Sequence, residues 1–304
     1  MGYYVIKNKE YRANQLKNRE MNYPPSIPSY KMAESCQRYK DKVTLITGGS
    51  SGIGKGLLEV FVRHGSKVVF CSNDEKQGKA VEKKINEAGY GGEATFVFAD
   101  VTKESDVKHL VQETINKYGL LNCVINNAGY HPPYQTIDDI TKDDFTKLFD
   151  LNVVGYFLIS KYALPHLRKT EGNIINIASM DGHHAAGGST IYVATKGAVL
   201  AMTRALAIDE AKYNVRVNSI SPGATSSPLL LKMVDISPDP EQQMQRYKDV
   251  SVLGRIGQPE EMGMTALYLS ADATFCTGID IQVSGGTPLN YADKNMRKDK
   301  TLFI

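Results

Sequence analysis

A tyrosine and a lysine stand four positions apart in the segment Tyr192-Val-Ala-Thr-Lys196. In a helix this spacing places both side chains on one face, with their Cβ atoms about 5–6 Å apart. A phenol has an ordinary pKa near ~10, too high for an efficient base at neutral pH, and a neighbouring ammonium group lowers it. The pair is therefore a candidate acid/base catalyst. The same spacing also arises by chance in a chain with 17 tyrosines, so the pair alone decides nothing.

A serine hydroxyl precedes this tyrosine by thirteen residues. Ser179 follows the apolar run 173–178, which is typical of a buried strand. A hydroxyl group at that strand end could hold a substrate oxygen beside the phenol. The alternative is a local hydrogen bond in the turn that ends the strand.

Two glycine- and asparagine-rich turns follow strand-like runs. Glycines 48, 52 and 54 come directly after the run 43–47. Glycine lets the backbone approach a pyrophosphate, and the first turn of a following helix offers it free N–H groups. A plain tight turn is the alternative, but the strand–turn–helix setting favours a phosphate site. The second turn, Asn126-Asn127-Ala128-Gly129, ends another strand, where its amides could tie loops together or contact a ribose.

These motifs are placed by alternating strand and helix patterns. Short, continuously apolar strands between helices are typical of a parallel sheet covered on both faces, and they predict a doubly wound α/β fold. The expected strands cover 43–47, 67–71, 94–99, 122–126, 173–178, 215–220 and 279–283, and the expected helices cover 53–64, 75–88, 104–118, 142–168 and 190–213. A proline-rich segment near 223–258 interrupts the pattern. Its place after a strand favours a lid over a simple surface loop.

The composition is that of an ordinary globular protein. The chain has 304 residues, of which 42% are apolar and 23% charged, with 26 Gly and 12 Pro, so collagen-like, low-complexity and disulfide-scaffold classes are excluded. A net charge of +3 is too small to argue for a nucleic-acid partner. No apolar run reaches the ~18 residues of a membrane span. The four cysteines are far apart and form no CxxC pair, so we expect free thiols and a cytoplasmic location.

The first 31 residues differ from the rest, with six Lys/Arg against two Glu. They contain no uninterrupted apolar stretch of the kind a secretory signal has. A mitochondrial transit peptide is an alternative, but Glu10, Glu20 and the scarcity of serine count against it. We expect residues 1–31 to be a poorly ordered basic extension and residues 32–304 to form one domain.

The order of these motifs resembles the short-chain dehydrogenase/reductase family over about residues 40–284. The resemblance implies a Rossmann-like, doubly wound parallel sheet of about seven strands in a single domain. It also implies an oxidoreductase that transfers a hydride between NAD(P) and a secondary alcohol or ketone, with a small sugar or steroid-like substrate. One alternative is an NADPH-dependent carbonyl or acyl-carrier-type reductase. Another is a catalytically silent dinucleotide-binding protein, which the filled catalytic positions count against.

The resemblance also assigns roles to single residues. Tyr192 matches the general acid/base, and Lys196 matches the lysine that lowers its pKa and binds the nicotinamide ribose. Ser179 matches the serine that orients the reacting oxygen, and Asn152 matches the asparagine that holds a relay water. The residues implied in cofactor binding are Gly48, Ser51, Gly52, Ile53, Gly54, Ser72, Asn73, Asp100, Val101, Asn127, Ala128, Gly129, Tyr192, Lys196, Pro222, Gly223, Thr225 and Ser227.

One departure from the family pattern bears on the choice of cofactor. Ser72 stands where NAD-preferring relatives place an aspartate that binds the ribose 2′-OH and repels a 2′-phosphate. Asn73 stands where users of NADP commonly place an arginine. A phosphate would find these two residues and Lys76, and a doubly charged phosphate needs a stronger basic partner. We therefore expect NAD, with NADP as the alternative.

Three polar residues are candidates for contact with the substrate. His131 follows the Asn-Asn-Ala-Gly turn, and Asp181 and His183 follow Ser179. Their polar character suits a sugar or polyol better than a flat steroid. Their spacing matches no metal motif, so we expect no metal.

Small residues line one face of the helix expected over 190–213, and the family resemblance implies that this helix and the one over 142–168 pair in a homotetramer.

Overall fold

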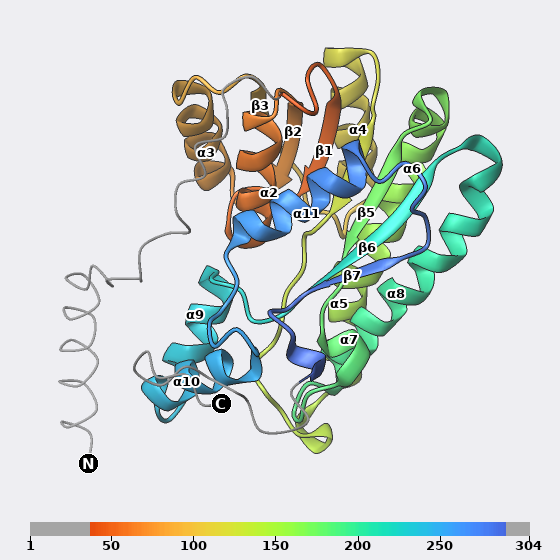
Figure 1. The fold of residues 1–304 in the computed structure, drawn as a ribbon. Helices are drawn as coiled ribbons and strands as arrows, with labels where there is room; N and C mark the ends of the chain where they lie inside the picture. The colour runs from red at the N-terminus through yellow and green to blue at the C-terminus, as the bar shows by residue number, and fades with distance from the viewer. Residues whose placement is uncertain (1–36, 290–304) are drawn as a thin grey trace, which may run out of the picture. The chain divides into compact units, whose positions relative to one another are not determined.

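The computed structural model describes residues 37–289. Seven parallel strands form one sheet in the order β3-β2-β1-β4-β5-β6-β7 (Figure 1). The strands are β1 (Val43–Thr47), β2 (Lys67–Ser72), β3 (Glu93–Phe98), β4 (Cys123–Asn126), β5 (Asn173–Ile177), β6 (Arg216–Pro222) and β7 (Asp280–Val283). The chain order reverses between β1 and β4, which leaves a crevice at the carboxyl ends of these strands. The predicted doubly wound sheet of seven strands in one domain is confirmed, and the predicted extension 1–31 lies outside the described residues.

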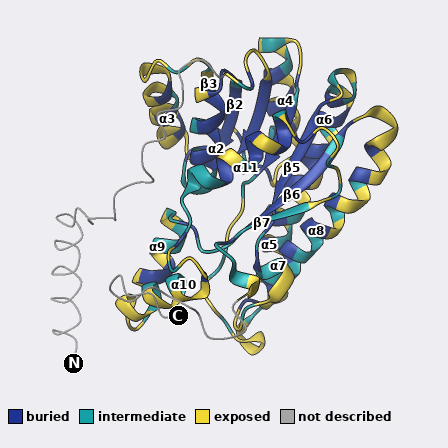
Figure 2. Ribbon diagram, in the orientation of Figure 1, coloured by how far each residue is buried: buried dark blue, intermediate teal, exposed yellow. Residues whose placement is uncertain are grey.

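Helices cover both faces of this sheet. One face carries α2 (Gly52–Arg63), α3 (Glu75–Glu87) and α11 (Pro259–Ala271), and the other carries α4 (Glu104–Tyr118), α6 (Gly155–Thr170) and α8 (Thr190–Glu210). Neighbouring strand residues serve opposite faces, because Ile46 belongs to the first apolar core and Leu45 to the second. Figure 2 shows the result, with buried strands between helices whose outer faces are exposed. The buried Cys71 and Cys123 are free thiols, as predicted.

The helix expected over 142–168 is interrupted in the structure. It consists of α5 (Lys142–Phe149), a π-helical turn over Asp150–Val154, and α6. A π-helical turn inserts extra backbone into a helix and is frequent at functional sites. This turn contains Asn152, one of the predicted site residues.

Helix α11 was not anticipated from the sequence. It packs against α2 through glycines, because a Cβ atom on Gly56 would lie 2.5 Å from Pro259 and one on Gly263 would lie 2.7 Å from Val60. The close approach of the two helices therefore depends on these two small residues. A periodicity argument looks for large apolar side chains and does not detect such a contact.

The proline-rich segment forms two short helices, α9 (Pro228–Asp235) and α10 (Pro240–Val250). Each begins with a capped N-terminus followed by proline, because Ser227 Oγ accepts from the Leu230 N–H at 3.2 Å and Asp239 Oδ1 accepts from the Gln242 N–H at 3.0 Å. Both helices contribute side chains to the cavity described below.

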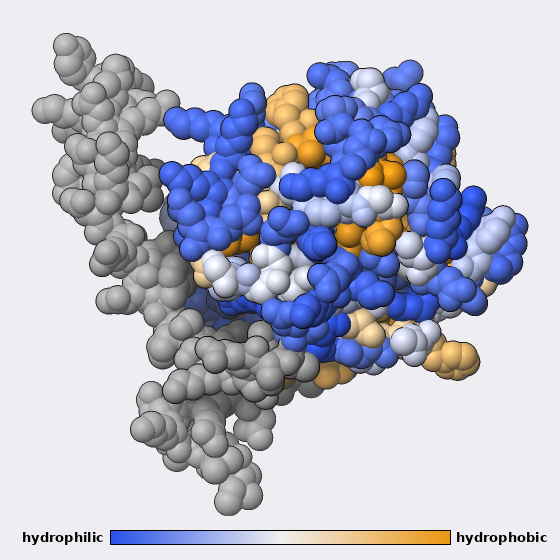
Figure 3. Space-filling model, turned by 90° about the horizontal axis from the view of Figure 1, so that it is seen from above, coloured by the Kyte–Doolittle hydropathy of each residue, from blue (hydrophilic) through white to orange (hydrophobic). Residues whose placement is uncertain are grey.

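Within residues 37–289, the stretch Thr190–Tyr213 is the one helix whose length and mean hydropathy of 1.4 would suit a membrane span. This helix packs against β6, as the core helices of globular proteins also do. The end of the molecule seen in Figure 3 is mostly hydrophilic, with its apolar side chains in small separate areas.

Candidate active site

A cavity of ≈ 960 Å³ opens beyond the carboxyl ends of β1, β2, β3, β4, β5 and β6. Every residue that the family resemblance assigned to the cofactor lines it, together with Ser179, His131 and Asp181. Of the predicted site residues, Asn152 and His183 are the two that do not line it. The loops after six parallel strands thus bring into one cavity residues that are far apart in the sequence.

The glycine turn after β1 has the shape that an anion site needs. Gly48 and Gly52 have φ values of +67° and +51°, which favour glycine, and a Cβ atom on Gly54 would lie 2.1 Å from the Gly48 carbonyl oxygen. The first turn of α2 has no acidic residue, and Ser51 gives it no side-chain cap. Its N–H groups therefore remain available for a pyrophosphate, so the residues present fit the phosphate part of a dinucleotide.

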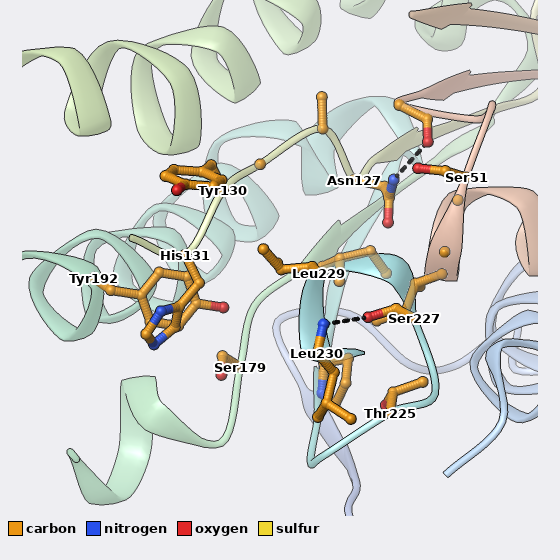
Figure 4. A pocket seen from close by; sticks show the side chains of 18 of the residues that line it. Ser51, Asn127, Tyr130, His131, Ser179, Tyr192, Thr225, Ser227, Leu229 and Leu230 are labelled. Carbon is orange, nitrogen blue, oxygen red and sulfur yellow. Dashed lines mark hydrogen bonds between the residues drawn. The ribbon is translucent and has the colours of Figure 1, made fainter. Parts of the chain in front are cut away.

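The Asn-Asn-Ala-Gly turn is tied to this glycine turn. Thr47 Oγ1 accepts hydrogen bonds from the N–H groups of Asn127 and Ala128 at 2.9 and 3.0 Å. The Asn127 side-chain amide donates to the carbonyl oxygens of Thr47 at 2.9 Å and Gly48 at 3.3 Å. Figure 4 shows one hydrogen bond from this amide beside Ser51. The amide group of Asn127 thus holds the cavity wall together, in addition to the ribose contact that the resemblance implies.

The end of the cavity beside β2 contains acidic groups but no basic one. Ser72 and Asn73 line it, and so does Asp74, which the sequence analysis did not single out. Asp74 also begins α3, because its Oδ1 accepts from the Gln77 N–H at 2.9 Å, and its own N–H donates to Ser72 Oγ at 2.9 Å. Lys76 does not line the cavity. Among the lining residues that the structure describes, Lys196 is the one lysine, and there is no arginine.

The opposite end contains the predicted catalytic residues. Figure 4 shows Tyr192 and Ser179 on the same side of the cavity, with the ring of His131 over the tyrosine. Burial raises the pKa of the Tyr192 phenol and the Ser179 hydroxyl partly offsets this, while the nearby Asp181 carboxylate raises that pKa further. Burial also lowers the pKa of Lys196 to about 7. The raised pKa of the phenol is opposite in direction to the lowering predicted from the sequence.

The position of Lys196 explains this difference. Its Nζ donates a hydrogen bond to the Ile177 carbonyl oxygen at 2.8 Å and lies 5.8 Å from the centre of the Tyr192 ring. The ammonium group therefore acts on a backbone oxygen of β5 more directly than on the phenol. A ribose that brought hydroxyl groups to Lys196 would give its charged form further partners.

Asn152 lies behind the cavity and is fully buried. Its amide donates to the Tyr130 carbonyl oxygen at 3.0 Å and to Thr195 Oγ1 at 3.2 Å, and its Oδ1 accepts from the Tyr130 N–H at 3.0 Å. The π-helical turn thereby joins the loop after β4 to the residue next to Lys196. The role of Asn152 as the holder of a relay water stays a prediction.

Two of the predicted substrate residues adjoin the phenol. The rings of His131 and Tyr192 are 4.2 Å apart at their centres, and His131 Nε2 lies 3.8 Å from Asp181 Oδ2. Burial lowers the pKa of His131, which favours the neutral form of the ring. Burial likewise raises the pKa of Asp181. A partly buried carboxylate with a neutral neighbour is a strong acceptor for hydroxyl groups of a ligand.

His183 is placed elsewhere. Its Nε2 lies 3.0 Å from Asp280 Oδ2 on β7 and 3.2 Å from Ser221 Oγ on β6. Residues 181–184 form the short helix α7 (Asp181–His184), in which Asp181 and His184 share the face toward the cavity and His183 points away. We therefore replace His183 by His184 in the substrate-facing set. From the sequence alone, no helix was expected over 181–184, so no facing direction could be assigned to these side chains.

Further lining residues come from α9 and α10 and were not singled out before. They are apolar or aromatic: Leu229, Leu230, Met233, Tyr247 and Val250. Figure 4 shows Leu229 and Leu230 across the cavity from Tyr192. Among residues 37–289, no group of three or more His, Cys, Asp or Glu side chains gathers closely enough to hold a metal ion.

Comparisons with known proteins agree with this geometry. Residues 48–288 match a family model described as "Enoyl-(Acyl carrier protein) reductase". The L-fucose dehydrogenase of Bos taurus is 46% identical over 257 residues, which cover 84% of this chain and 93% of that protein.

Solved structures are similar over the same region. The crystal structure of 3-ketoacyl-(acyl-carrier-protein) reductase from Brucella melitensis, complexed with NADH, has a TM-score of 0.75 and 30% identity, covering 82% of this chain and 98% of that one. Levodione reductase has a TM-score of 0.80 and 27% identity, covering 83% and 100%.

Proposed function

The chain belongs to the short-chain dehydrogenase/reductase family, whose members act on CH–OH groups with NAD(P), and from this premise we propose that it oxidises a secondary hydroxyl group of a small sugar such as L-fucose, with NAD as its cofactor. The observation that carries the proposal is the pairing of Tyr192 and Ser179 with the polar groups of His131 and Asp181 at one end of a cavity whose other end has a pyrophosphate turn. Relatives named L-fucose dehydrogenase supply the choice of sugar.

Each residue of the site has its own role in the proposed reaction. The Ser179 hydroxyl orients the substrate oxygen, and the Tyr192 phenolate receives the hydroxyl proton at its Oη. Lys196 favours that phenolate when its ammonium group is charged. A nicotinamide dinucleotide, when bound, supplies the acceptor for the hydride of the carbinol carbon. The glycine turn and the loops after β2, β3 and β6 hold this cofactor.

The Asp181 carboxylate and the His131 ring favour a polyol over a flat apolar substrate. A sugar presents vicinal hydroxyl groups, and a carboxylate can accept hydrogen bonds from two of them at once. An apolar steroid would leave the carboxylate without donors in a partly buried position, which is energetically costly. Substrates with several hydroxyl groups should therefore be preferred.

The acidic end of the cavity favours NAD. A 2′-phosphate would approach Asp74 and Asp100 without a basic residue to pair with it, since Lys196 serves the other end. Like charges brought together in a cavity are unfavourable. The Asp74 carboxylate thus takes over part of the discrimination that relatives obtain from an aspartate at position 72.

An NADPH-linked reductase of carrier-bound acyl groups is the second candidate. The description of the matching family model and the name of the Brucella melitensis protein support the reaction on carrier-bound acyl groups, but that structure holds NADH and not NADPH. The test is a panel of sugars, polyols, steroids and acyl thioesters assayed with NAD and NADP in parallel. We expect turnover of L-fucose or a related sugar with NAD. Turnover confined to ketoacyl thioesters with NADPH would overturn the proposal, and no turnover with intact cofactor binding would favour a silent binding protein.

A further inference from the structure

Two tyrosines from distant parts of the chain meet at the cavity. Tyr134 lies in the loop after β4 and Tyr247 lies on α10, and their phenol oxygens are 3.3 Å apart. Both side chains line the cavity that contains Tyr192 and Asp181. Tyr134 is 48% exposed, so this contact lies at the outer limit of the cavity and not in its interior.

A row of rings leads from this contact to the reacting phenol. The Tyr134 ring packs edge-on against His131, with 5.5 Å between centres, and His131 packs against Tyr192 at 4.2 Å. The outer tyrosine pair is therefore only two ring contacts away from the catalytic hydroxyl. The ring centres of Tyr134 and Tyr192 are therefore no more than about 10 Å apart, a span closer to that of one sugar ring than to that of a fused-ring steroid.

We infer that Tyr134 and Tyr247 form a clasp that limits the substrate to about one sugar ring and contacts its outer face. The inference rests on the proposed sugar-oxidising function and names residues that determine its specificity. Tyrosine suits such a position, because its ring offers an apolar face to the C–H groups of a pyranose and its hydroxyl group bonds to a sugar hydroxyl.

The two halves of the clasp differ in how firmly they are held. The backbone beside Tyr134 is fixed to the loop before α8, because the Gln135 N–H donates to the Gly188 carbonyl oxygen at 2.9 Å. Helix α10, which carries Tyr247, has no buried residue. Elements with little buried surface open at low cost. Tyr247 can therefore swing away to admit a substrate and return to its contact with Tyr134.

The test compares substrates of two sizes. Wild type, Tyr247→Phe, Tyr247→Ala and Tyr134→Ala are assayed for kcat/KM with L-fucose and with a 17β-hydroxysteroid at saturating NAD. We expect both alanine variants to lose about tenfold in kcat/KM for the sugar through a higher KM, and to gain about tenfold for the steroid. Tyr247→Phe keeps the ring and should retain the preference for size with a smaller loss for the sugar.

Two measurements keep the result interpretable. Arg246→Ala, an exposed change on the same helix outside the cavity lining, should leave both substrates unaffected, and the Kd for NAD should be that of wild type in every variant. Alanine variants with an unchanged ratio of sugar to steroid kcat/KM would overturn the clasp. If the wild type oxidises a one-ring alcohol other than a sugar, the proposed sugar substrate is wrong. The variants are then compared with that alcohol and the steroid, and the ratio of the two kcat/KM values tests the clasp. A wild type that prefers the steroid would overturn both.

Discussion

The ammonium group of Lys196 donates its hydrogen bond to the carbonyl oxygen of Ile177, at 2.8 Å, and the Tyr156 phenol donates to the same oxygen at 3.2 Å. The Tyr156 ring also faces this ammonium group, with 5.4 Å from Nζ to the ring centre. The lysine is thus held by β5 and α6 before any ligand arrives. This arrangement fixes its position at the cost of burying a charge.

The buried lysine makes the stability of the protein without cofactor depend on pH. Burial lowers the pKa of Lys196 to about 7, whereas in an unfolded chain it is near ~10.4. Between these values the unfolded chain holds a proton that the folded protein lacks, so stability should rise with pH across this window. Lys196→Met should flatten this rise and increase the free energy of unfolding at pH 7 by about 1–2 kcal/mol, while abolishing turnover.

Chemical denaturation at several pH values checks this expectation. Lys147→Met, which changes an exposed lysine paired with Asp143, serves as the control and should leave the slope with pH unchanged. A less stable Lys196→Met protein with an unaltered slope would mean that Lys196 is charged and well paired in the folded state.

Removal of the Tyr192 hydroxyl should abolish the reaction and spare the cofactor. Tyr192→Phe keeps the ring that packs on His131, so the fold and the Kd for NAD should stay close to those of wild type. Turnover should fall by about four orders of magnitude, because no other group can take the substrate proton at that position. Tyr130→Phe, a change in the same cavity wall, is the control. Retention of more than a few per cent of kcat would place the acid/base role on another residue.

Asp181 and His183 stand two positions apart and should behave differently. Asp181→Asn removes the carboxylate charge from the cavity and should raise KM for the sugar by about tenfold, since charge-assisted hydrogen bonds are the stronger ones. His183→Ala leaves Asp280 without its imidazole partner and should instead lower the free energy of unfolding by about 1 kcal/mol at unchanged KM. Steady-state kinetics and thermal unfolding of both variants separate the two roles. A raised KM in His183→Ala alone would return His183 to the substrate site.

Local sequence patterns predict strand ends and glycine turns, but they do not predict contacts between distant segments. Strand ends and glycine turns are local, and they led to Tyr192, Ser179 and the residues expected to bind a cofactor, all of which line one cavity. The π-helical turn around Asn152 depends on hydrogen bonds to Tyr130 and Thr195, so no periodicity within 142–168 reveals it. Tyr247 reaches the cavity from 113 residues beyond Tyr134. Such a contact is created by the packing of α10 beside the loop after β4 and has no signature in either segment.

The assembly is a separate prediction, and we propose the homotetramer that the family resemblance implies. Phe157 on α6 is 50% exposed and Phe145 on α5 is 43% exposed, an unusual place for large apolar rings unless another surface covers them. Phe157→Glu should put a charge into that interface and reduce the mass found by light scattering to that of a smaller species. Lys83→Glu on α3, on the opposite face of the sheet from α6, should leave the mass unchanged. A monomeric wild type at micromolar concentration would contradict the tetramer.

The choice of cofactor gives the last prediction. The Asp74 carboxylate lines the cavity beside Ser72, and an asparagine in its place can still accept from the Gln77 N–H and begin α3. Asp74→Asn should therefore keep the fold and raise kcat/KM with NADP by about tenfold, equivalent to about 1.4 kcal/mol of lost repulsion. Ser72→Asp should tighten NAD and disfavour NADP, because a carboxylate bonds the 2′-OH more strongly than a hydroxyl does. Asn73→Arg should act in the opposite direction by pairing with the 2′-phosphate. The measurement is the ratio of kcat/KM for the two cofactors, in wild type and the three variants. A wild type that prefers NADP by about a hundredfold or more would exclude NAD. An Asp74→Asn variant with an unchanged ratio would show that Asp74 does not contribute to the discrimination.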